Sequence, residues 1–314
     1  MHLRLIVPRR LTDVVIDRLL VTPGVAHVVR HAGPAIRPEG ELVSCDVARE
    51  ATNEVIEWLQ EQGVHREGAI TVEALEAVVS DAAAVAEEIA PGHGADALVW
   101  EELEARTRSE AILTASFLTL MAVAATIAAV GILLDSPILI IGAMVVGPEY
   151  GPLAALCVAI VRRRSGPART AGGTLMVGLI VAAGAALVAT ALFRVTSLAP
   201  ESYELGDREL TAFISHPNGM AAVVAVLAGV VGMLALTEAR SGVLVGVLVS
   251  VTTIPAAGNV GVATAYRQWS EVAGAAMQLG VNVAGLVAAG VTTLAVQARF
   301  TTRLPRLRTS TQAR

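Results

Sequence analysis

The chain has 314 residues, of which 54% are hydrophobic, and its formal net charge at pH 7 is −5. Residues 1–110 hold 10 Arg against 20 Asp and Glu, whereas residues 111–314 hold 13 Arg against 8 acids. The acidic first part argues against binding of nucleic acid, which requires a basic surface. The two cysteines, Cys45 and Cys157, fall in different parts of the chain, so the sequence predicts no disulfide framework.

Residues 1–80 are predicted to form a small α+β domain of the ferredoxin-like type, with the order βαββαβ. Four segments alternate like half-buried strands, and two segments have helical spacing and stop signals after them. The predicted strands are residues 2–8, 25–30, 42–47 and 69–72, and the predicted helices cover residues 11–19 and 54–59. Such a domain could bind a small effector, or it could be a folded spacer or an oligomerisation domain.

Residues 81–110 are interpreted as a linker followed by a charged amphipathic helix that leads into the membrane. The apolar run at the start of the chain is too short for the core of a signal peptide. The first run long enough to span a bilayer starts only after residue 110. We therefore expect the first domain to remain in the cytoplasm.

Residues 111–298 are predicted to form a domain of six transmembrane helices, followed by a basic cytoplasmic tail at residues 299–314. Each of six segments is at least roughly 20 residues long, as a span requires, and carries at most one charge. The segments are Ala111–Leu134, Ser136–Val161, Thr170–Phe193, Pro217–Thr237, Ser241–Tyr266 and Val272–Ala298. Close helix packing is expected at glycines such as Gly178, Gly184, Gly229 and Gly232.

The arginines of the second part indicate which ends of the helices face the cytoplasm. With residues 1–110 inside, six crossings place ten of these arginines inside and only Arg194, Arg208 and Arg267 outside, as the positive-inside rule expects. A re-entrant hairpin at the second segment would instead move the run Arg162–Arg164 to the outer face. The sequence therefore predicts a multi-pass protein of the bacterial cytoplasmic (inner) membrane with both termini in the cytoplasm.

The second and fifth segments both carry Pro and Gly near the middle. An offset of 107 residues brings Pro148 onto Pro255 and Gly151 onto Gly258. Because each half has three spans, the second half enters the membrane in the opposite sense to the first. This pattern is typical of transporters built from two inverted three-helix repeats, in which the broken helices carry the binding site.

Glu149 is the only acidic residue within the six segments. It lies about 18 Å along a helix from Pro137, which is close to the bilayer midplane. A carboxylate at that depth costs several kcal/mol unless it is protonated, paired or hydrated, and is therefore a candidate for binding a substrate or an ion. The alternative is a structural cap at the N-terminus of a half-helix.

The candidate binding site combines residues from both breaks. Hydroxyl and amide groups of the fifth segment would face Glu149 if the two halves meet, although the hydroxyls could bond to carbonyls of their own helix instead. Asn282 shares a helix face with Gln278, and the two could line the cavity or only bond to a neighbouring helix. The candidate residues are Gly147, Pro148, Glu149, Tyr150, Gly151, Thr252, Thr253, Pro255, Gly258, Asn259 and Asn282.

Two stretches of the sequence resemble the signatures of a known family. They are IGAMVVGPEYGPLAAL at residues 141–156 and VGVLVSVTTIPAAGNVGVA at residues 245–263. Both are similar to stretches of the membrane proteins that carry the domain of unknown function 389, and the resemblance covers residues 105–298. Many members also have a similar ferredoxin-like N-terminal part. The resemblance supports the predicted fold, and the family has no established activity.

These patterns favour a transporter of a small solute or ion with a cytoplasmic regulatory domain, in contact with membrane lipid and assembled as a homo-oligomer. An ion channel and a non-transporting sensor or scaffold are the alternatives. The sequence has no Ser-His-Asp, metal, phosphate-loop or haem constellation. We therefore expect no enzymatic activity, no metal ion and no cofactor.

Overall fold

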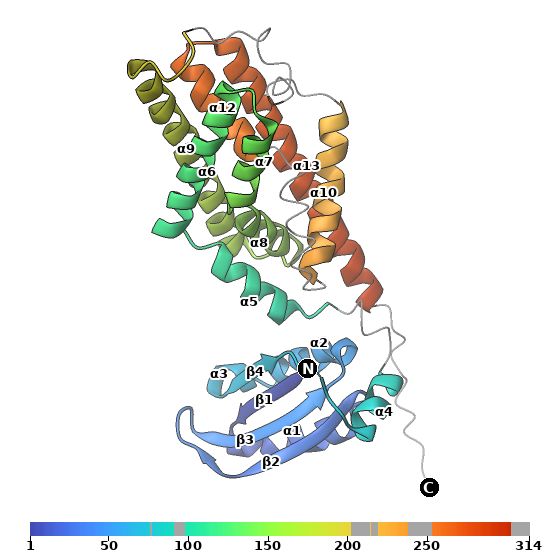
Figure 1. Ribbon diagram of the computed structural model, residues 1–314. Helices are drawn as coiled ribbons and strands as arrows, with labels where there is room; N and C mark the ends of the chain where they lie inside the picture. Colours follow the sequence, from blue (N-terminus) through green and yellow to red (C-terminus); the bar gives the residue numbers. More distant parts are fainter. Residues whose placement is uncertain (76, 91–97, 202–213, 215–218, 238–252, 303–314) are drawn as a thin grey trace. The chain divides into compact units, whose positions relative to one another are not determined.

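The computed structural model describes residues 1–75, 77–90, 98–201, 214, 219–237 and 253–302. The chain divides into two compact units, one formed by Met1–Leu103 with residues 297–302 and the other by Glu104–Val296. The first unit contains a β-sheet, and the second consists of helices (Figure 1). The division falls within helix α5 (Trp100–Glu110).

The first unit is built on a four-stranded antiparallel sheet. Its strands are β1 (His2–Val7), β2 (Val25–Ala35), β3 (Gly40–Val47) and β4 (Ala69–Glu73), in the spatial order β2-β3-β1-β4. The helices between them in sequence are α1 (Arg9–Val21), α2 (Arg49–Glu61) and the short α3 (Val64–Glu67). The predicted order of four strands and two main helices is confirmed, whereas α3 and the continuation of β2 beyond Arg30 were not predicted.

Alternation along the strands places one face of the sheet in the core. Leu3, Leu5 and Val7 are fully buried, and they form one hydrophobic cluster with residues of both main helices, which therefore cover the same face. Burial also raises the pKa of the Cys45 thiol to about 12, so this cysteine is a protonated packing residue. Other members of the cluster are Val15, Leu19, Val43, Val47, Val55, Ile56 and Leu59.

The opposite face of the sheet carries a polar network around Asp46. One carboxylate oxygen lies 2.7 Å from Nδ1 of His2, and the other lies 2.6 Å from Nδ1 of His27. Partial burial favours a higher pKa for the Asp46 carboxyl, but the hydrogen bonds from the two His rings outweigh it and hold that pKa below its usual range. Nε2 of His27 also lies 2.8 Å from the hydroxyl of Ser80, which ties the start of α4 (Asp81–Ile89) to β2.

The compact unit extends beyond residue 80, the predicted end of the first domain. Helix α4 packs on β2, and the residues that lead into α5 pack on α2. Leu98 and Val99 are almost fully buried. Asn53 uses both ends of its amide, because Nδ2 donates to the carbonyl of Leu98 at 2.5 Å and Oδ1 accepts from the N–H of Trp100 at 3.3 Å.

A fragment of residues 1–103 is expected to fold alone and to be more stable than a fragment of residues 1–80. Leu98 and Val99 are buried only in the longer fragment. After the cost of ordering the added residues, we expect the free energy of unfolding to rise by about 1–3 kcal/mol. Urea denaturation of both fragments measures the difference. Asn53→Ala should remove most of the gain, and equal stability of the two fragments would contradict this docking.

The second unit contains the helices that span the membrane. Four described helices are long and apolar enough to cross a bilayer: α6 (Ala115–Leu133), α9 (Ser165–Val195), α10 (Gly219–Thr237) and α13 (Trp269–Thr302). Helices α7 (Pro137–Val146) and α8 (Tyr150–Val161) add a fifth span if they count as one. In the predicted fifth segment, residues 241–252 lie outside the described residues and the remainder is α12 (Thr253–Ala265). By helix length and hydropathy, the chain is a multi-pass membrane protein.

Small residues bring the membrane helices together. Gly178 of α9 lies against the ring of Phe117 in α6, and Gly261 of α12 lies against backbone atoms of Ala183 and Leu187 in α9. Helices α6, α9 and α12 therefore pack against one another. Gly184 has no neighbour within 4 Å in the part of the chain that the structure describes. Other glycines in close contacts are Gly229, Gly232, Gly258, Gly285 and Gly290.

Arg194 joins the C-terminal ends of α9 and α12. Its guanidinium donates to the carbonyl of Ala265 at 2.5 Å and lies 4.5 Å from the centroid of the Tyr266 ring. The Tyr266 hydroxyl in turn donates to the carbonyl of Pro200 at 2.6 Å. Because these ends are adjacent and the two helices pack along each other, α9 and α12 run in the same direction.

A second group of arginines lies at the N-terminal end of α9. Glu104 of α5 pairs with Arg162 at 2.9 Å and with Arg164 at 2.6 Å. Of the other arginines used to predict topology, Arg208, Arg240 and those in residues 303–314 of the basic tail lie outside the described residues. The described arginine groups thus occupy opposite ends of one long helix.

Candidate functional site

The second membrane segment is broken at residues 147–149. Helix α7 ends at Val146, and Gly147 has an extended backbone with φ −65° and ψ 127°. Pro148 has no N–H to continue the helix, and it disfavours helical dihedrals at the residue before it. The axis turns by 54° before α8 begins at Tyr150. The interruption expected from the Gly-Pro sequence is therefore present.

The side chain of Glu149 joins this break to α12. The hydroxyl of Thr253 donates to Oε1 of Glu149 at 2.6 Å, and the two residues are only 3% and 2% exposed. The other oxygen, Oε2, has no hydrogen-bond partner among the described residues. An ionised carboxylate offers about four acceptor positions, and the described residues fill only one of them with a side-chain hydrogen bond. A proton or a cation is the kind of ligand that such a group can still bind.

Gly147 is required by the close approach of this carboxylate. A Cβ atom at Gly147 would overlap Oε2 of Glu149 and would lie 2.6 Å from Cγ1 of Ile254. A larger residue would therefore displace the carboxylate or the side chain of Ile254. Among the candidate residues, the structure brings Gly147, Glu149 and Thr253 into one cluster.

The side chains of Glu149 and Thr253 bond to each other and not to their own helices. Glu149 is the N-cap residue of α8, yet its side chain makes no capping hydrogen bond to that helix. The single hydroxyl proton of Thr253 goes to Glu149 and not to a carbonyl of its own helix. Thr264 shows the other behaviour, because its hydroxyl donates to the carbonyl of Val260 at 2.6 Å. The Glu149–Thr253 bond therefore links segments that are 104 residues apart in sequence.

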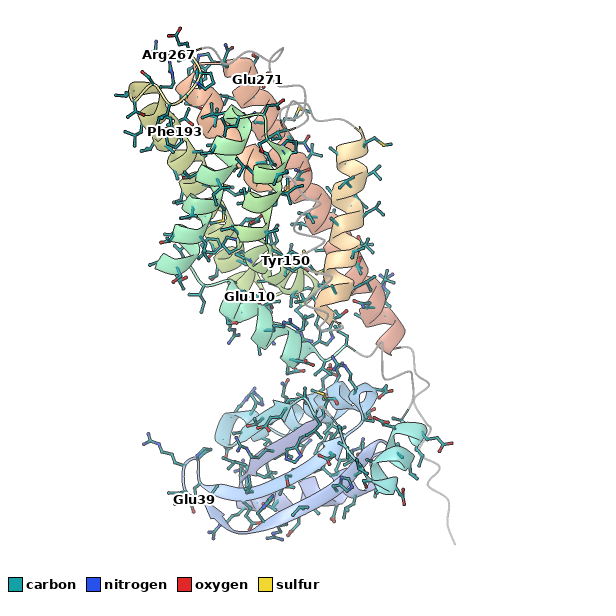
Figure 2. The ribbon with its side chains drawn as sticks, in the orientation of Figure 1. Glu39, Glu110, Tyr150, Phe193, Arg267 and Glu271 are labelled. Carbon is teal, nitrogen blue, oxygen red and sulfur yellow. The ribbon has the colours of Figure 1, made fainter. Side chains whose placement is uncertain are left out.

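The break lies nearer to the end of the helical unit at which α6 begins. Gly151, two residues after Glu149, lies against the side chain of Glu110, and Glu110 precedes the first membrane helix. Figure 2 shows Tyr150 close to Glu110. Counting along a straight helix suggested a central position for Glu149, but the 54° bend means that α7 and α8 do not share one axis.

Tyr150 and Gly258 face neighbours other than the carboxylate. Tyr150 is buried, and its hydroxyl lies beside Gly232 of α10 with no hydrogen-bond partner in the described part of the chain. Gly258 packs against Ala125 and Ala128 of α6. Gly258 therefore permits close helix contact, and Tyr150 contributes an unsatisfied hydroxyl at the α8–α10 contact.

Among the described residues, no other candidate from the fifth segment is seen to bond to the Glu149 carboxylate. Pro255 lies in the first turn of α12, where a missing N–H is tolerated. Asn259 is buried, and it lies about 240° around the helix from Thr253 because each residue turns the helix by about 100°. Thr252 lies outside the described residues. Of this group, only Thr253 is seen to bond to Glu149.

Helix α13 contributes one expected contact and one unexpected acid. Nε2 of Gln278 donates to Oδ1 of Asn282 at 3.0 Å, so the predicted shared face is confirmed. Glu271, in the first turn, is only 5% exposed, and its Oε2 has no hydrogen-bond partner among the described residues. Figure 2 shows it at the same end of the helical unit as Phe193 and Arg267.

Sequence reasoning missed Glu271 because this residue immediately precedes the sixth apolar segment. An acid at that place is ordinarily a favourable partner of the helix dipole. Across the described ranges, no three His, Cys, Asp or Glu side chains are grouped so that they could hold a metal ion.

The fold and the broken segment define a class: a multi-pass helical membrane protein with a small α+β unit before its spans. Residues 144–288 match the family described as "Domain of unknown function (DUF389)". The family resemblance of its sequence is confirmed over that range, which includes both Glu149 and Thr253. Neither a curated protein nor a solved structure matches the chain.

Proposed function

We propose that the protein is a transporter of a small solute or ion, and that Glu149 binds a proton or a small cation during transport. The observation that carries the proposal is the buried Glu149 carboxylate, which has one oxygen bonded to Thr253 and the other without a partner among the described residues. A charged carboxylate within a membrane protein costs several kcal/mol unless it is neutralised. One hydrogen bond to a charged group contributes only about 1.5–3 kcal/mol. A bound proton or cation would supply the remaining stabilisation.

We propose that the protein has six spans arranged as two inverted three-helix repeats. In such an arrangement, the third span of the first half and the second span of the second half cross the membrane in the same direction. Helices α9 and α12 have this relation, since their C-terminal ends meet at Arg194. The two halves then meet at the Glu149–Thr253 contact, as expected of a site between repeats.

The arginine groups support a sidedness for these spans. Arg162 and Arg164 lie at the end of α9 opposite to Arg194. If the first group faces the cytoplasm, the positive-inside rule is satisfied for a bacterial inner membrane. The sheet unit, whose strand order β2-β3-β1-β4 fits a ferredoxin-like fold, would then be a cytoplasmic regulatory domain.

Glu149→Gln tests the proposal, because it keeps the shape of the side chain and removes the charge. The full-length protein is reconstituted in proteoliposomes, and fluxes of H⁺, Na⁺ and K⁺ are measured singly between about pH 5 and 8. We expect the wild-type protein to carry a pH-dependent flux of at least one of these ions. In the Gln variant this flux should fall by at least about tenfold, which corresponds to about 1.4 kcal/mol.

Glu271→Gln is the matched control for this experiment. Glu271 is also a buried carboxylate with an unpartnered oxygen in the described part of the chain, but it lies at the end of the helical unit away from Tyr150 (Figure 2). Its variant should retain most of the wild-type flux. An unchanged flux in Glu149→Gln, or equal losses in both variants, would show that Glu149 is not the ion-binding group. No flux of any of the three ions in the wild type would count against cation transport.

A further inference from the structure

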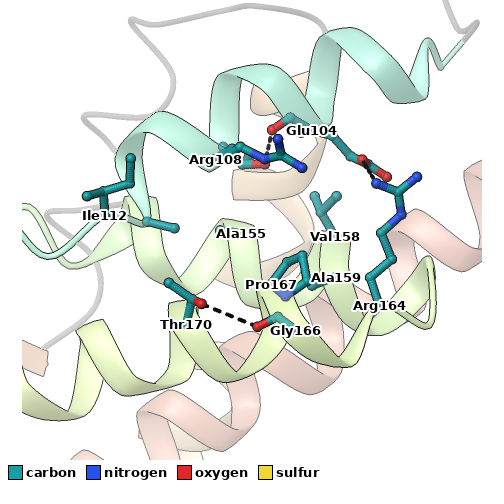
Figure 3. Close-up of a pocket in the computed structure, with 12 residues that line it drawn as sticks. Glu104, Arg108, Ile112, Ala155, Val158, Ala159, Arg164, Gly166, Pro167 and Thr170 are labelled. Atoms are coloured by element: carbon teal, nitrogen blue, oxygen red, sulfur yellow. Dashed lines mark hydrogen bonds and ion pairs between the residues drawn. The ribbon is translucent and has the colours of Figure 1, made fainter. Parts of the chain in front are cut away.

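A cavity of about 360 Å³ lies beside the N-terminal end of α9, between α5 and α8 (Figure 3). Its volume falls within the range of about 300–1,000 Å³ that is usual for sites of small ligands. The polar side chains around it include Glu104, Arg108 and Arg164. The rest of the wall is largely apolar and is formed by Ala111, Ile112, Ala155, Val158, Ala159 and Pro167.

The polar side of the cavity has an excess of positive charge. Glu104 is shared by two guanidinium groups, those of Arg162 at 2.9 Å and Arg164 at 2.6 Å. Arg108 forms no ion pair with any side chain in the described residues, and Figure 3 shows its guanidinium extending from α5 over the cavity. Two guanidinium groups in the lining, those of Arg108 and Arg164, against the one carboxylate of Glu104 leave one positive charge, which can bind an anion.

The cavity lies where the membrane helices start. Ile112 precedes the first residue of α6, Ala115, by three positions, and Thr170 is the first residue of the long apolar run of α9. Side chains at this level meet the headgroups of a bilayer, while the apolar wall continues towards the acyl region. A ligand that satisfies both surfaces must have an anionic group attached to an apolar body.

We propose that this cavity binds one anionic phospholipid, with its phosphate held by Arg108 and Arg164 and its glycerol and first acyl carbons against the apolar wall. Basic pockets between membrane helices are suited to lipid headgroups of this charge. A soluble phosphate would use only the arginines and leave the apolar wall uncovered. A zwitterionic lipid would leave the excess positive charge without compensation. The inference does not rest on the proposed transport activity.

The test uses the full-length protein in nanodiscs of phosphatidylcholine, with or without phosphatidylglycerol. Native mass spectrometry measures the lipid that stays bound, and thermal unfolding measures stabilisation. The wild-type protein should retain phosphatidylglycerol in preference to phosphatidylcholine. Arg108→Gln, which breaks no ion pair in the described residues, should weaken this retention by about tenfold. Arg267→Gln, an exposed arginine at the other end of the helical unit (Figure 2), is the matched control and should behave like the wild type.

Ala159→Leu tests whether the lipid is bound in the cavity or only attracted by the surface charge. This change leaves every charge in place and fills the cavity from its apolar wall, so it should also release the lipid. If the Arg108 variant does not fold, the result for Ala159→Leu tests the proposal by itself. Retention of phosphatidylglycerol equal to wild type in either variant would overturn the proposal. Equal retention of phosphatidylcholine would do the same. Stabilisation of the wild type by inorganic phosphate at a matched concentration would identify a site for the free anion instead.

Discussion

Gly261→Leu is expected to prevent α12 from packing on α9. A Cβ atom at Gly261 would overlap the carbonyl oxygen of Ala183 and would lie 2.6 Å from the backbone nitrogen of Leu187. Both are backbone atoms of a helix and cannot rotate away as a side chain can, so the two helices must separate. Overpacking costs about 1–3 kcal/mol and occasionally more. We expect the upper end of this range and a fall of roughly 10 °C in the unfolding midpoint of the purified protein.

Gly184→Leu is the control for this substitution, because Gly184 lies in α9 with no neighbour within 4 Å among the described residues. Leucine is a better helix former than glycine, so this variant should be as stable as the wild type or slightly more stable. Thermal unfolding of both variants in the same detergent gives the comparison. Similar losses at both positions would mean that the tight α9–α12 contact is not what limits stability.

Gly68→Ala is expected to lower the free energy of unfolding of the 1–103 fragment by about 3 kcal/mol. A Cβ atom at Gly68 would overlap the carbonyl oxygen of Ile6 and would lie 3.0 Å from that of Val64. Ile6 pairs with Ala69, the first residue of β4. The added methyl group therefore pushes β4 away from β1, at the point where the two strands begin to pair.

Gly63→Ala is the control for Gly68→Ala, because it tests backbone strain at a position with free space. Gly63 has a positive φ of 78°, but no described atom lies within 4 Å of its Cβ position. Alanine there meets only the cost of the left-handed conformation, about 1 kcal/mol. Urea denaturation should therefore rank the fragments as wild type, Gly63→Ala and then Gly68→Ala. A Gly68 variant as stable as the Gly63 variant would contradict the steric explanation.

The sheet unit was largely predictable from the sequence, because its strands alternate cleanly. Leu3, Leu5 and Val7 point to the core and fix the pattern of β1. The docking of the residues before α5 was not predictable, since it depends on one amide, that of Asn53, meeting the backbone at Leu98, 45 residues later. Such a contact has no periodic signal in the sequence.

The candidate site was predictable only in part. Glu149 and the break beside it follow from a single acid among apolar residues with an adjacent Gly-Pro pair. The direction of each neighbouring side chain depends on how the helices pack, and Tyr150 and Gly258 consequently face α10 and α6. The cavity between α5, α8 and α9 was missed for a similar reason. It is assembled from three separate segments whose residues are ordinary when taken singly.

The length of α9 is close to the thickness of a lipid bilayer. Arg164, its N-cap, and Arg194, in its last turn, are separated by about 45 Å along a helix, close to the full thickness of a bilayer with its headgroups. Both arginines are fixed by contacts, one to Glu104 and the other to the end of α12. Tilting α9 is one way to match a thinner bilayer. Both α12, which begins at Thr253, and α8, which follows Glu149, pack on α9, so we expect a change in the tilt of α9 to act on the Glu149–Thr253 contact.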